Sequence, residues 1–127
     1  MSRGAFAVVF RDSKILLVKP PNWVSQFAEH WNLPGGVVEN GESLEDGVKR
    51  EILEEAGIKC EIKDLLMTDH NEKFDTSIAI FRATYISGEI SVQKNEISDA
   101  KWMTINEALQ EPLAFNIDKV LLPFIQS

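Results

Sequence analysis

One segment of the chain, residues 43–57, is bounded by residues that typically begin and end helices. Ser43 is a favoured N-cap residue, and Asp46 follows three positions later, where capping boxes place an acid. Gly57 suits the position after the last turn, where the chain leaves a helix with positive φ. An α-helix turns 100° per residue, which brings three apolar residues of the segment into one stripe: Val48, Ile52 and Ala56. The segment therefore predicts an amphipathic helix with one face on a core.

Three glutamates lie beside this apolar stripe. Glu51, Glu54 and Glu55 fall within an arc of about 100° on the predicted helix, so their carboxylates converge although like charges repel. They border the buried face instead of lying opposite it, which favours the rim of a cleft. From the charge pattern alone, the alternative is a solvated helix rich in glutamate.

Strand patterns dominate the remainder of the chain. Apolar runs at 5–10 and 15–18 flank the sequence RDSK and predict a hairpin, and Cys60 lies in another strand pattern. An alternating pattern predicts a strand at 76–86. Two more short strands are predicted beyond it, at 90–92 and 100–104. Residues 19–32 are expected to form a long loop, which in compact domains is often functional.

The C-terminal part predicts further helices. Thr104 and Glu107 match a capping box, and a closing helix is expected over 117–125, bent or ended near Pro123. Strands with two or three helices predict an α/β (α+β) fold, in which helices flank a mixed β-sheet. At 127 residues, the chain is expected to be one domain spanning 1–127.

Composition narrows the classes of function. The formal net charge is −7, whereas general nucleic-acid binders need a cationic surface. Cys60 is the only cysteine, which excludes an internal disulfide and a cysteine-rich metal site. The N-terminal apolar run is too short for a signal peptide, and no stretch is long enough to span a membrane. These features predict a cytoplasmic protein without general nucleic-acid or membrane binding.

The acidic helix is part of a longer sequence signature with fixed spacing. From Gly36 the chain continues with five residues, Glu42, seven residues and then REILEEAGI. This pattern resembles, at every specified position, the signature of the Nudix hydrolases, the MutT-like family. WNLPGG before it and NEISDAKWM after it extend a weaker resemblance over most of the chain. The resemblance implies the Nudix fold and a Mg²⁺-dependent hydrolase of nucleoside diphosphate-linked compounds, with Mn²⁺ as a substitute ion.

The same resemblance implies roles for the residues of the signature. Glu54 and Glu55 would be the central metal ligands, and Glu51 would be a ligand or the general base. The Gly36 carbonyl would be a further ligand. Arg50 would ion-pair with the carboxylates and orient them, completing the catalytic set. The chemistry agrees, because Mg²⁺ takes oxygen ligands and commonly binds carboxylates together with substrate phosphates.

Two more acids are candidates. Glu42 is expected either to bind metal through water or to support the loop. Glu96 stands six residues before Trp102, where MutT-like proteins often place an extra metal ligand or base. The alternative for Glu96 is a solvated loop acid, and Trp102 itself is predicted to lie in the core.

Base recognition has weaker candidates. Asn116 follows a proline near the last helix, as the purine-reading asparagine of MutT does, but asparagine is also a favoured N-cap and precedes a helical run here. Four aromatic residues could stack on a base or pack internally: Trp31, Phe74, Trp23 and Phe27.

The substrate is narrowed only by missing markers. ADP-ribose hydrolases tend to carry a proline downstream of the signature, and dinucleoside polyphosphate hydrolases a tyrosine, whereas NEKFDTS contains neither. This favours a nucleoside triphosphate, oxidised or unmodified, cleaved to a nucleoside monophosphate and pyrophosphate. The alternatives are an ADP-ribose, nucleotide-sugar or dinucleoside polyphosphate hydrolase and a non-catalytic nucleotide- or RNA-binding module. An isomerase of the same fold would need a catalytic cysteine, whereas Cys60 is predicted to pack. A homodimer is left open.

Overall fold

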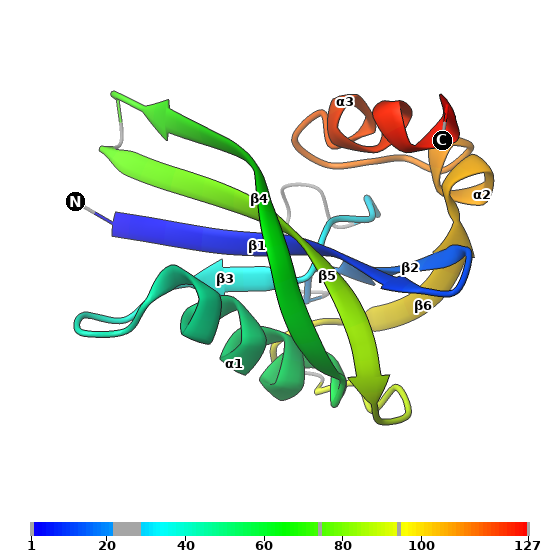
Figure 1. Cartoon of the computed structure of the whole chain (residues 1–127), viewed down its shortest axis with the longest axis horizontal. Helices are drawn as coiled ribbons and strands as arrows, with labels where there is room; N and C mark the ends of the chain where they lie inside the picture. The colour runs from blue at the N-terminus through cyan, green and yellow to red at the C-terminus, as the bar shows by residue number, and fades with distance from the viewer. Residues whose placement is uncertain (1, 22–28, 74, 94, 127) are drawn as a thin grey trace.

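A six-stranded mixed β-sheet forms the centre of the computed structural model, which describes residues 2–21, 29–73, 75–93 and 95–126 (Figure 1). The strands are β1 (Ser2–Arg11), β2 (Lys14–Lys19), β3 (Gly35–Val37), β4 (Lys59–Asn71), β5 (Thr76–Ser87) and β6 (Asp99–Thr104). Their order is β4-β5-β1-β2-β6, and β3 also pairs with β1. β1 and β5 are parallel, while the other pairs are antiparallel. The predicted mixed sheet is confirmed.

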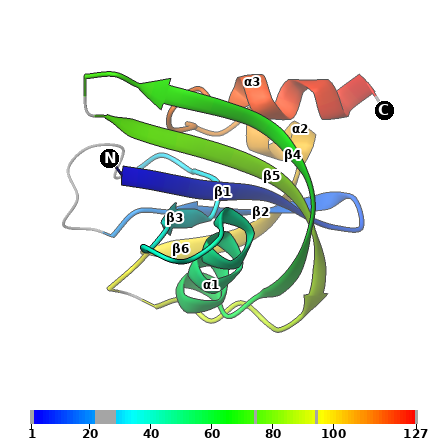
Figure 2. The same ribbon diagram turned by 60° about the vertical axis from the view of Figure 1, so that its left-hand side comes forward.

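Helices cover both faces of this sheet (Figures 1 and 2). They are α1 (Leu44–Ala56), α2 (Ile105–Leu109), α3 (Asp118–Leu121) and the 3₁₀ helix η1 (Leu122–Gln126). Alternate residues of β1 face opposite ways: Ala7 packs with α1, whereas Val8 packs with α2 and α3. Each face of the sheet therefore has its own buried core. None of the helices in the described residues is long and apolar enough to cross a membrane.

The sheet divides along one edge of β1. β2 pairs with the C-terminal end of β1 at Phe10 and Arg11, while β3 pairs with its N-terminal part at residues 4–6. β2 continues instead with β6, from Lys14 to Lys19. β2 and β3 therefore pair with different parts of β1.

The predicted helix ends are confirmed. Ser43 Oγ accepts a hydrogen bond from the Asp46 N–H at 3.1 Å, and Gly57, with φ of 73°, closes α1. Thr104 and Glu107 form the expected reciprocal capping box at the start of α2. The closing helix changes near Pro123, as predicted: α3 ends at Leu121, and the 3₁₀ helix η1 continues from Leu122 to Gln126.

Two local predictions are wrong. Residues 90–92 do not form a strand: Ser91 N–H and Gln93 N–H donate to the carbonyls of Ala56 and Glu55, at 2.8 and 3.1 Å. The segment therefore provides hydrogen-bond donors for the last carbonyl groups of α1 instead of pairing with β5. The N-cap of α3 is Ile117, without a side-chain hydrogen bond, so Asn116 does not cap this helix.

Candidate active site

Helix α1 sets the three signature glutamates at different depths. Val48, Ile52 and Ala56 are fully buried, which fixes the orientation of the helix against the sheet. Glu55, on the neighbouring stripe, is only 8% exposed. The Glu51 side chain is 15% exposed and that of Glu54 is 49% exposed. The acids thus border the buried face of α1, as the sequence predicted, and their exposure increases from Glu55 to Glu51 to Glu54.

Arg50 lies among these acids and holds them by hydrogen bonds. Its Nε and Nη2 donate to the two carboxylate oxygens of Glu42, at 2.8 and 3.1 Å. Its Nη1 donates to Glu51 Oε1 at 3.0 Å and to Glu54 Oε2 at 3.1 Å. Nη2 also donates to the Val37 carbonyl at 3.1 Å. The hydrogen bonds from Arg50 are the main reason that the pKa of Glu42 falls to about 2.

The two glycines of the LPGG turn make room for the acids. Gly35 N–H donates to Glu55 Oε1 at 3.0 Å, across the gap between β3 and α1. A Cβ atom on Gly36 would lie 2.8 Å from both the carboxyl carbon and Oε2 of Glu51. Glu51 can therefore approach the backbone only because position 36 has no side chain.

Burial and mutual repulsion raise the pKa values of the buried acids. Burial is the main cause that raises the pKa of Glu55 to about 8, and Glu51, Glu96 and Glu54 raise it further. Burial also raises the pKa of Glu51, to which Glu54 and Glu96 add. Glu96 comes from the loop before β6, so a third segment adds negative charge to the same place.

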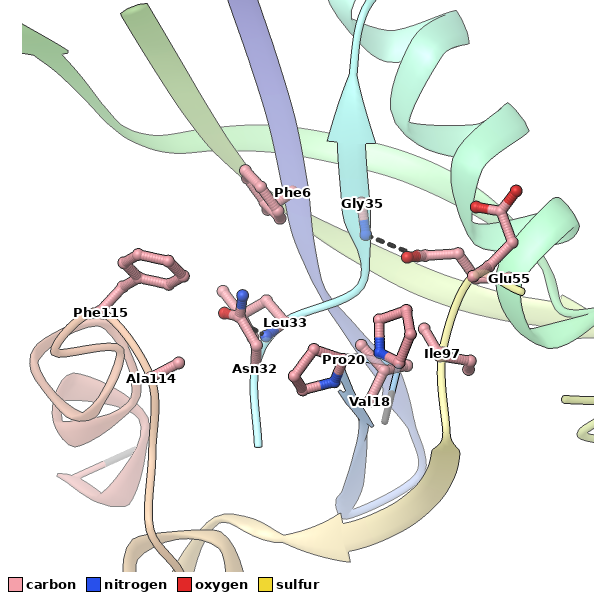
Figure 3. Close-up of a pocket in the computed structure, with 12 residues that line it drawn as sticks. Phe6, Val18, Pro20, Asn32, Leu33, Gly35, Glu55, Ile97, Ala114 and Phe115 are labelled. Atoms are coloured by element: carbon pink, nitrogen blue, oxygen red, sulfur yellow. Dashed lines mark hydrogen bonds between the residues drawn. The ribbon is translucent and has the colours of Figure 1, made fainter. Parts of the chain in front are cut away.

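A pocket of about 250 Å³ opens beside the buried acids (Figure 3). Glu55 and Glu96 lie in its wall, together with Gly35. The other lining residues are mostly apolar: Phe6, Val18, Pro20, Pro21, Asn32, Leu33, Ile97, Ala114 and Phe115. In Figure 3, Glu55 and Gly35 lie toward one side of the pocket and Phe115 toward the other. The pocket therefore has an acidic end and an aromatic end.

The donor atoms at the acidic end fit a hard divalent cation. Within the described residues, no three acidic, histidine or cysteine side chains converge on one point, because Arg50 holds Glu51 and Glu54 while Gly35 holds Glu55. The atoms present are nonetheless all oxygens, as Mg²⁺ prefers. The raised pKa values of Glu51 and Glu55 show that positive charge would be favourable there. The groups that could hold an ion are Glu51, Glu54, Glu55, Glu96 and the Gly36 carbonyl.

The predicted base-binding residues do not gather in this pocket. Trp31 is 5% exposed in the core beneath α3, with Lys19 Nζ 4.8 Å from its ring centroid. Asn116 is exposed and is not among the lining residues. Phe74, Trp23 and Phe27 lie outside the described residues.

The sequence did not indicate several of the residues that line the pocket. Outside the pocket, it correctly predicted that Cys60 and Trp102 pack in the protein interior. Phe6, Asn32 and Phe115 line the pocket, but they belong to separate segments without a shared motif. Cys60 is 4% exposed, and burial raises the pKa of its thiol to about 11. Trp102 packs against the α1-side core, with its ring centroid 5.6 Å from that of Tyr85.

Comparison with known proteins gives consistent relatives. A family model described as NUDIX domain matches residues 1–124. The NAD-capped RNA hydrolase NudC of Pseudomonas aeruginosa is 33% identical over 124 residues, which are 96% of this chain and 43% of NudC. A putative 8-oxo-dGTP diphosphatase of Bacillus subtilis is 33% identical over 81% of this chain and 66% of its own length. An ADP-ribose pyrophosphatase of Methanocaldococcus jannaschii is 31% identical, over 94% of this chain and 70% of its own length.

The solved structures agree with this grouping. The MutT NUDIX hydrolase from Burkholderia pseudomallei superimposes with a TM-score of 0.78 at 31% identity, covering 96% of this chain and 95% of that chain. The present chain spans less than half the length of NudC. Because the family model matches nearly the whole chain, the similarity is not confined to the acidic helix. The chain belongs to the Nudix family.

Proposed function

We propose that the protein is a Mg²⁺-dependent pyrophosphohydrolase that cleaves a nucleoside triphosphate, oxidised or unmodified, to a nucleoside monophosphate and pyrophosphate. One observation supports this most: Glu55 and Glu96 line a single pocket whose opposite side is apolar and aromatic. The acidic end suits a cation that binds phosphates, and the aromatic end suits a planar base. A nucleotide is a ligand with both requirements.

Five groups would hold the cation: Glu51, Glu54, Glu55, Glu96 and the Gly36 carbonyl. A bound Mg²⁺ ion would polarise a phosphoryl oxygen and lower the pKa of a bound water molecule. The side chains of the protein would position the carboxylates that hold the ion. Arg50 orients Glu51 and Glu54 through Nη1, and its own place is fixed by two hydrogen bonds to Glu42.

The reaction needs one acceptor for a proton. When the water oxygen attacks phosphorus, the P–O bond to the leaving pyrophosphate breaks and the water proton passes to a carboxylate. Glu51, Glu55 and Glu96 are the candidates, since burial raises the pKa of Glu51 and of Glu55 and Glu96 lines the pocket together with Glu55. Glu55 is the most buried of the signature acids, which shields the proton-accepting region from bulk water.

The names of the relatives indicate which classes of substrate should be considered. They include an 8-oxo-dGTP diphosphatase, an ADP-ribose pyrophosphatase and an NAD-capped RNA hydrolase. Each name denotes a compound with a nucleoside attached to a diphosphate, which is the part common to our proposal. A nucleoside triphosphate comes first here because the downstream markers of the ADP-ribose and dinucleoside polyphosphate groups are missing from the sequence.

A substrate panel tests the proposal. Purine, pyrimidine, oxidised, ADP-linked and dinucleoside compounds are incubated with Mg²⁺ or Mn²⁺, and the phosphate products are separated by chromatography. We expect pyrophosphate release from a triphosphate by wild type and a loss of at least about 100-fold in Glu54→Gln. Glu61→Gln is a matched control, because Glu61 is an exposed acid on β4 that pairs with Lys63.

Each contrary result has a defined meaning. Equal rates for wild type and Glu54→Gln would remove the acidic cluster from the mechanism. Cleavage of ADP-ribose or a dinucleoside polyphosphate alone would replace the substrate class. Nucleotide binding without turnover with either ion would show a binding module instead of an enzyme.

A further inference from the structure

The loop between β3 and α1, residues 38–43, carries the acid that fixes Arg50. Glu42 N–H donates to the Glu39 carbonyl at 3.1 Å, and Glu39 N–H donates to Glu42 Oε1 at 3.0 Å, so the loop folds into a turn. Apart from Val38 and Glu42, its residues are exposed. Packing alone therefore does not fix the outer part of the loop.

Arg3, near the start of β1, attaches this loop to the sheet. Its Nη2 donates to the carbonyls of Glu39 and Glu42, each at 3.1 Å. Its own carbonyl accepts the Val38 N–H at 2.8 Å. In Figure 1, the start of β1, the end of β3 and the start of α1 lie at the same end of the molecule. Arg3 thus bonds to the backbone of the loop both at its start and near its end, and sets where the loop lies.

A continuous series of hydrogen bonds leads from Arg3 to the acids of α1. The Glu42 carboxylate accepts two hydrogen bonds from Arg50, and Arg50 donates to Glu51 and Glu54. Hydrogen bonds from Arg50 are the main cause of the lowered pKa of Glu42, and the charge of Arg3 is a smaller one. A displacement of the loop would therefore move Arg50 and, with it, the two carboxylates that it holds.

Arg3 itself lies away from the pocket that contains Glu55 and Glu96. It lines a different cavity, of about 550 Å³, together with Leu44 and residues of β4 and β5. Among the described residues, none lines both cavities. A nucleotide in the acidic pocket would therefore be affected by Arg3 through the loop and not through direct contact.

We propose that Arg3 is a positioning residue for the metal-binding acids: it sets the loop from which Glu42 holds Arg50, without touching the ion or the nucleotide. This inference rests on the proposed function, since it assumes that Glu51 and Glu54 bind the ion. Replacing residues that orient metal ligands typically costs about 10- to 100-fold in metal affinity or activity. Arg3 acts further from the ion than Arg50, so we expect an effect of about tenfold, at the lower end of this range.

Mn²⁺ binding in the absence of nucleotide measures the position of these acids without turnover. Free Mn²⁺ is followed by its EPR signal as the metal-free protein is titrated. Arg3→Met removes both hydrogen bonds to the loop and should raise the Kd of Mn²⁺ about tenfold. Arg3→Lys keeps a donor that can reach the two carbonyls, so it should recover most of the affinity.

Two further variants serve as controls. Arg11→Met removes an arginine from the other end of β1, where its guanidinium lies 4.2 Å from the Tyr85 ring centroid, so it should lower Tm and leave the Kd of Mn²⁺ unchanged. Glu54→Gln should lose Mn²⁺ affinity, because Glu54 is a proposed ligand. Normal Mn²⁺ binding by Glu54→Gln would refute the metal site and this inference together. Normal binding by Arg3→Met alone would refute only the role of Arg3.

A double replacement shows whether Arg3 acts through Glu42. Glu42→Gln weakens the attachment of Arg50, so it should itself raise the Kd of Mn²⁺. Because both changes break the same series of contacts, adding Arg3→Met to Glu42→Gln should change this Kd by less than about twofold. Fully additive effects would overturn the positioning role. A raised KM for the nucleotide at unchanged Mn²⁺ affinity would also overturn it, and would make Arg3 a phosphate contact instead.

Discussion

The two ends of the pocket are built in different ways. At the acidic end, Glu51, Glu54 and Glu55 come from one helix, and Arg50 of the same helix donates hydrogen bonds to Glu51 and Glu54. Glu55 instead accepts a hydrogen bond from Gly35 N–H, and Glu96 comes from the loop before β6. At the aromatic end, the lining side chains come from β1, from the segment before β3 and from the turn before α3. The helical part of the acidic end is encoded locally, whereas Glu96 and the aromatic end come together only after folding. Most of the residues proposed to hold the metal are therefore encoded in one motif, whereas the rest of the pocket depends on distant segments.

The largest effect expected at the acidic end is a pH dependence of stability caused by Glu55. The folded-state pKa of this carboxyl is raised to about 8 by burial and by neighbouring acids, so its stabilising contribution is complete below the unfolded value near 4.5. That contribution is lost as the pH rises through about 8. Without metal, the free energy of unfolding should fall by several kcal/mol over this interval, since one pKa unit corresponds to about 1.4 kcal/mol.

Urea denaturation in EDTA, at several pH values, measures this dependence. Glu55→Gln keeps an oxygen for the Gly35 N–H but cannot ionise, so it should be more stable than wild type at pH 8 and similar near pH 4.5. Saturating Mg²⁺ should flatten the wild-type profile, because the cation favours the ionised carboxylate. Identical profiles for wild type and Glu55→Gln would show that another group causes the dependence.

A second prediction compares two arginines. Arg50 is 25% exposed in its side chain and bonds to Glu42, Glu51 and Glu54, so Arg50→Met should lower the free energy of unfolding in EDTA by about 3 kcal/mol. Arg82→Met breaks a single pair with Asp64, 2.7 Å long but on the surface, and should cost less than about 1 kcal/mol. Equal losses would mean that the acidic cluster does not need its arginine. Adding Mg²⁺ should restore part of the stability of Arg50→Met only.

A third prediction separates geometry from stability at two glycines. In Gly36→Ala the new Cβ would lie 2.8 Å from the Glu51 carboxyl, which must move, so kcat/KM should fall about 100-fold with little change in Tm. Gly41 has φ of 85° with nothing within 4 Å of an added Cβ. Gly41→Ala should therefore lower stability by about 1 kcal/mol and leave kcat/KM unchanged. Full activity in Gly36→Ala would contradict a position-sensitive role for Glu51.

The accuracy of the sequence predictions follows the same contrast between local and distant contacts. The caps at Ser43 and Gly57 and the position of the acids beside the buried face depend on residues within one helix, and they were predicted correctly. The electrostatic coupling of Glu96 to Glu51 depends on how the loop before β6 returns to α1. The sequence indicated Glu96 only through family resemblance, because no local pattern reveals that return.

The mistaken elements also have a physical reason. Residues 90–92 have the alternation of a strand, and Ile90 and Val92 do pack on the core. The N–H groups of Ser91 and Gln93, however, donate to carbonyls at the end of α1. β4 was recognised only near Cys60. Its later part is largely exposed and carries register shifts near residues 63 and 66, which remove the period-two pattern. Burial periodicity therefore shows where a segment packs, but it does not show which groups its backbone bonds.

The smallest effect is expected at Asn116, where the base-reading and turn-forming roles can be separated. Its φ of 59° is tolerated by asparagine and glycine, so Asn116→Gly should change the free energy of unfolding by less than about 0.5 kcal/mol, while Asn116→Leu should cost about 1 to 2 kcal/mol. Asn116→Gly removes the amide but keeps the turn. If Asn116 serves only the turn, the ratio of guanine to adenine nucleotide affinity in Asn116→Gly will equal that of wild type. A changed ratio, measured calorimetrically in Mg²⁺ with GTP and ATP analogues that carry a methylene group between the α and β phosphorus atoms, would assign base recognition to Asn116.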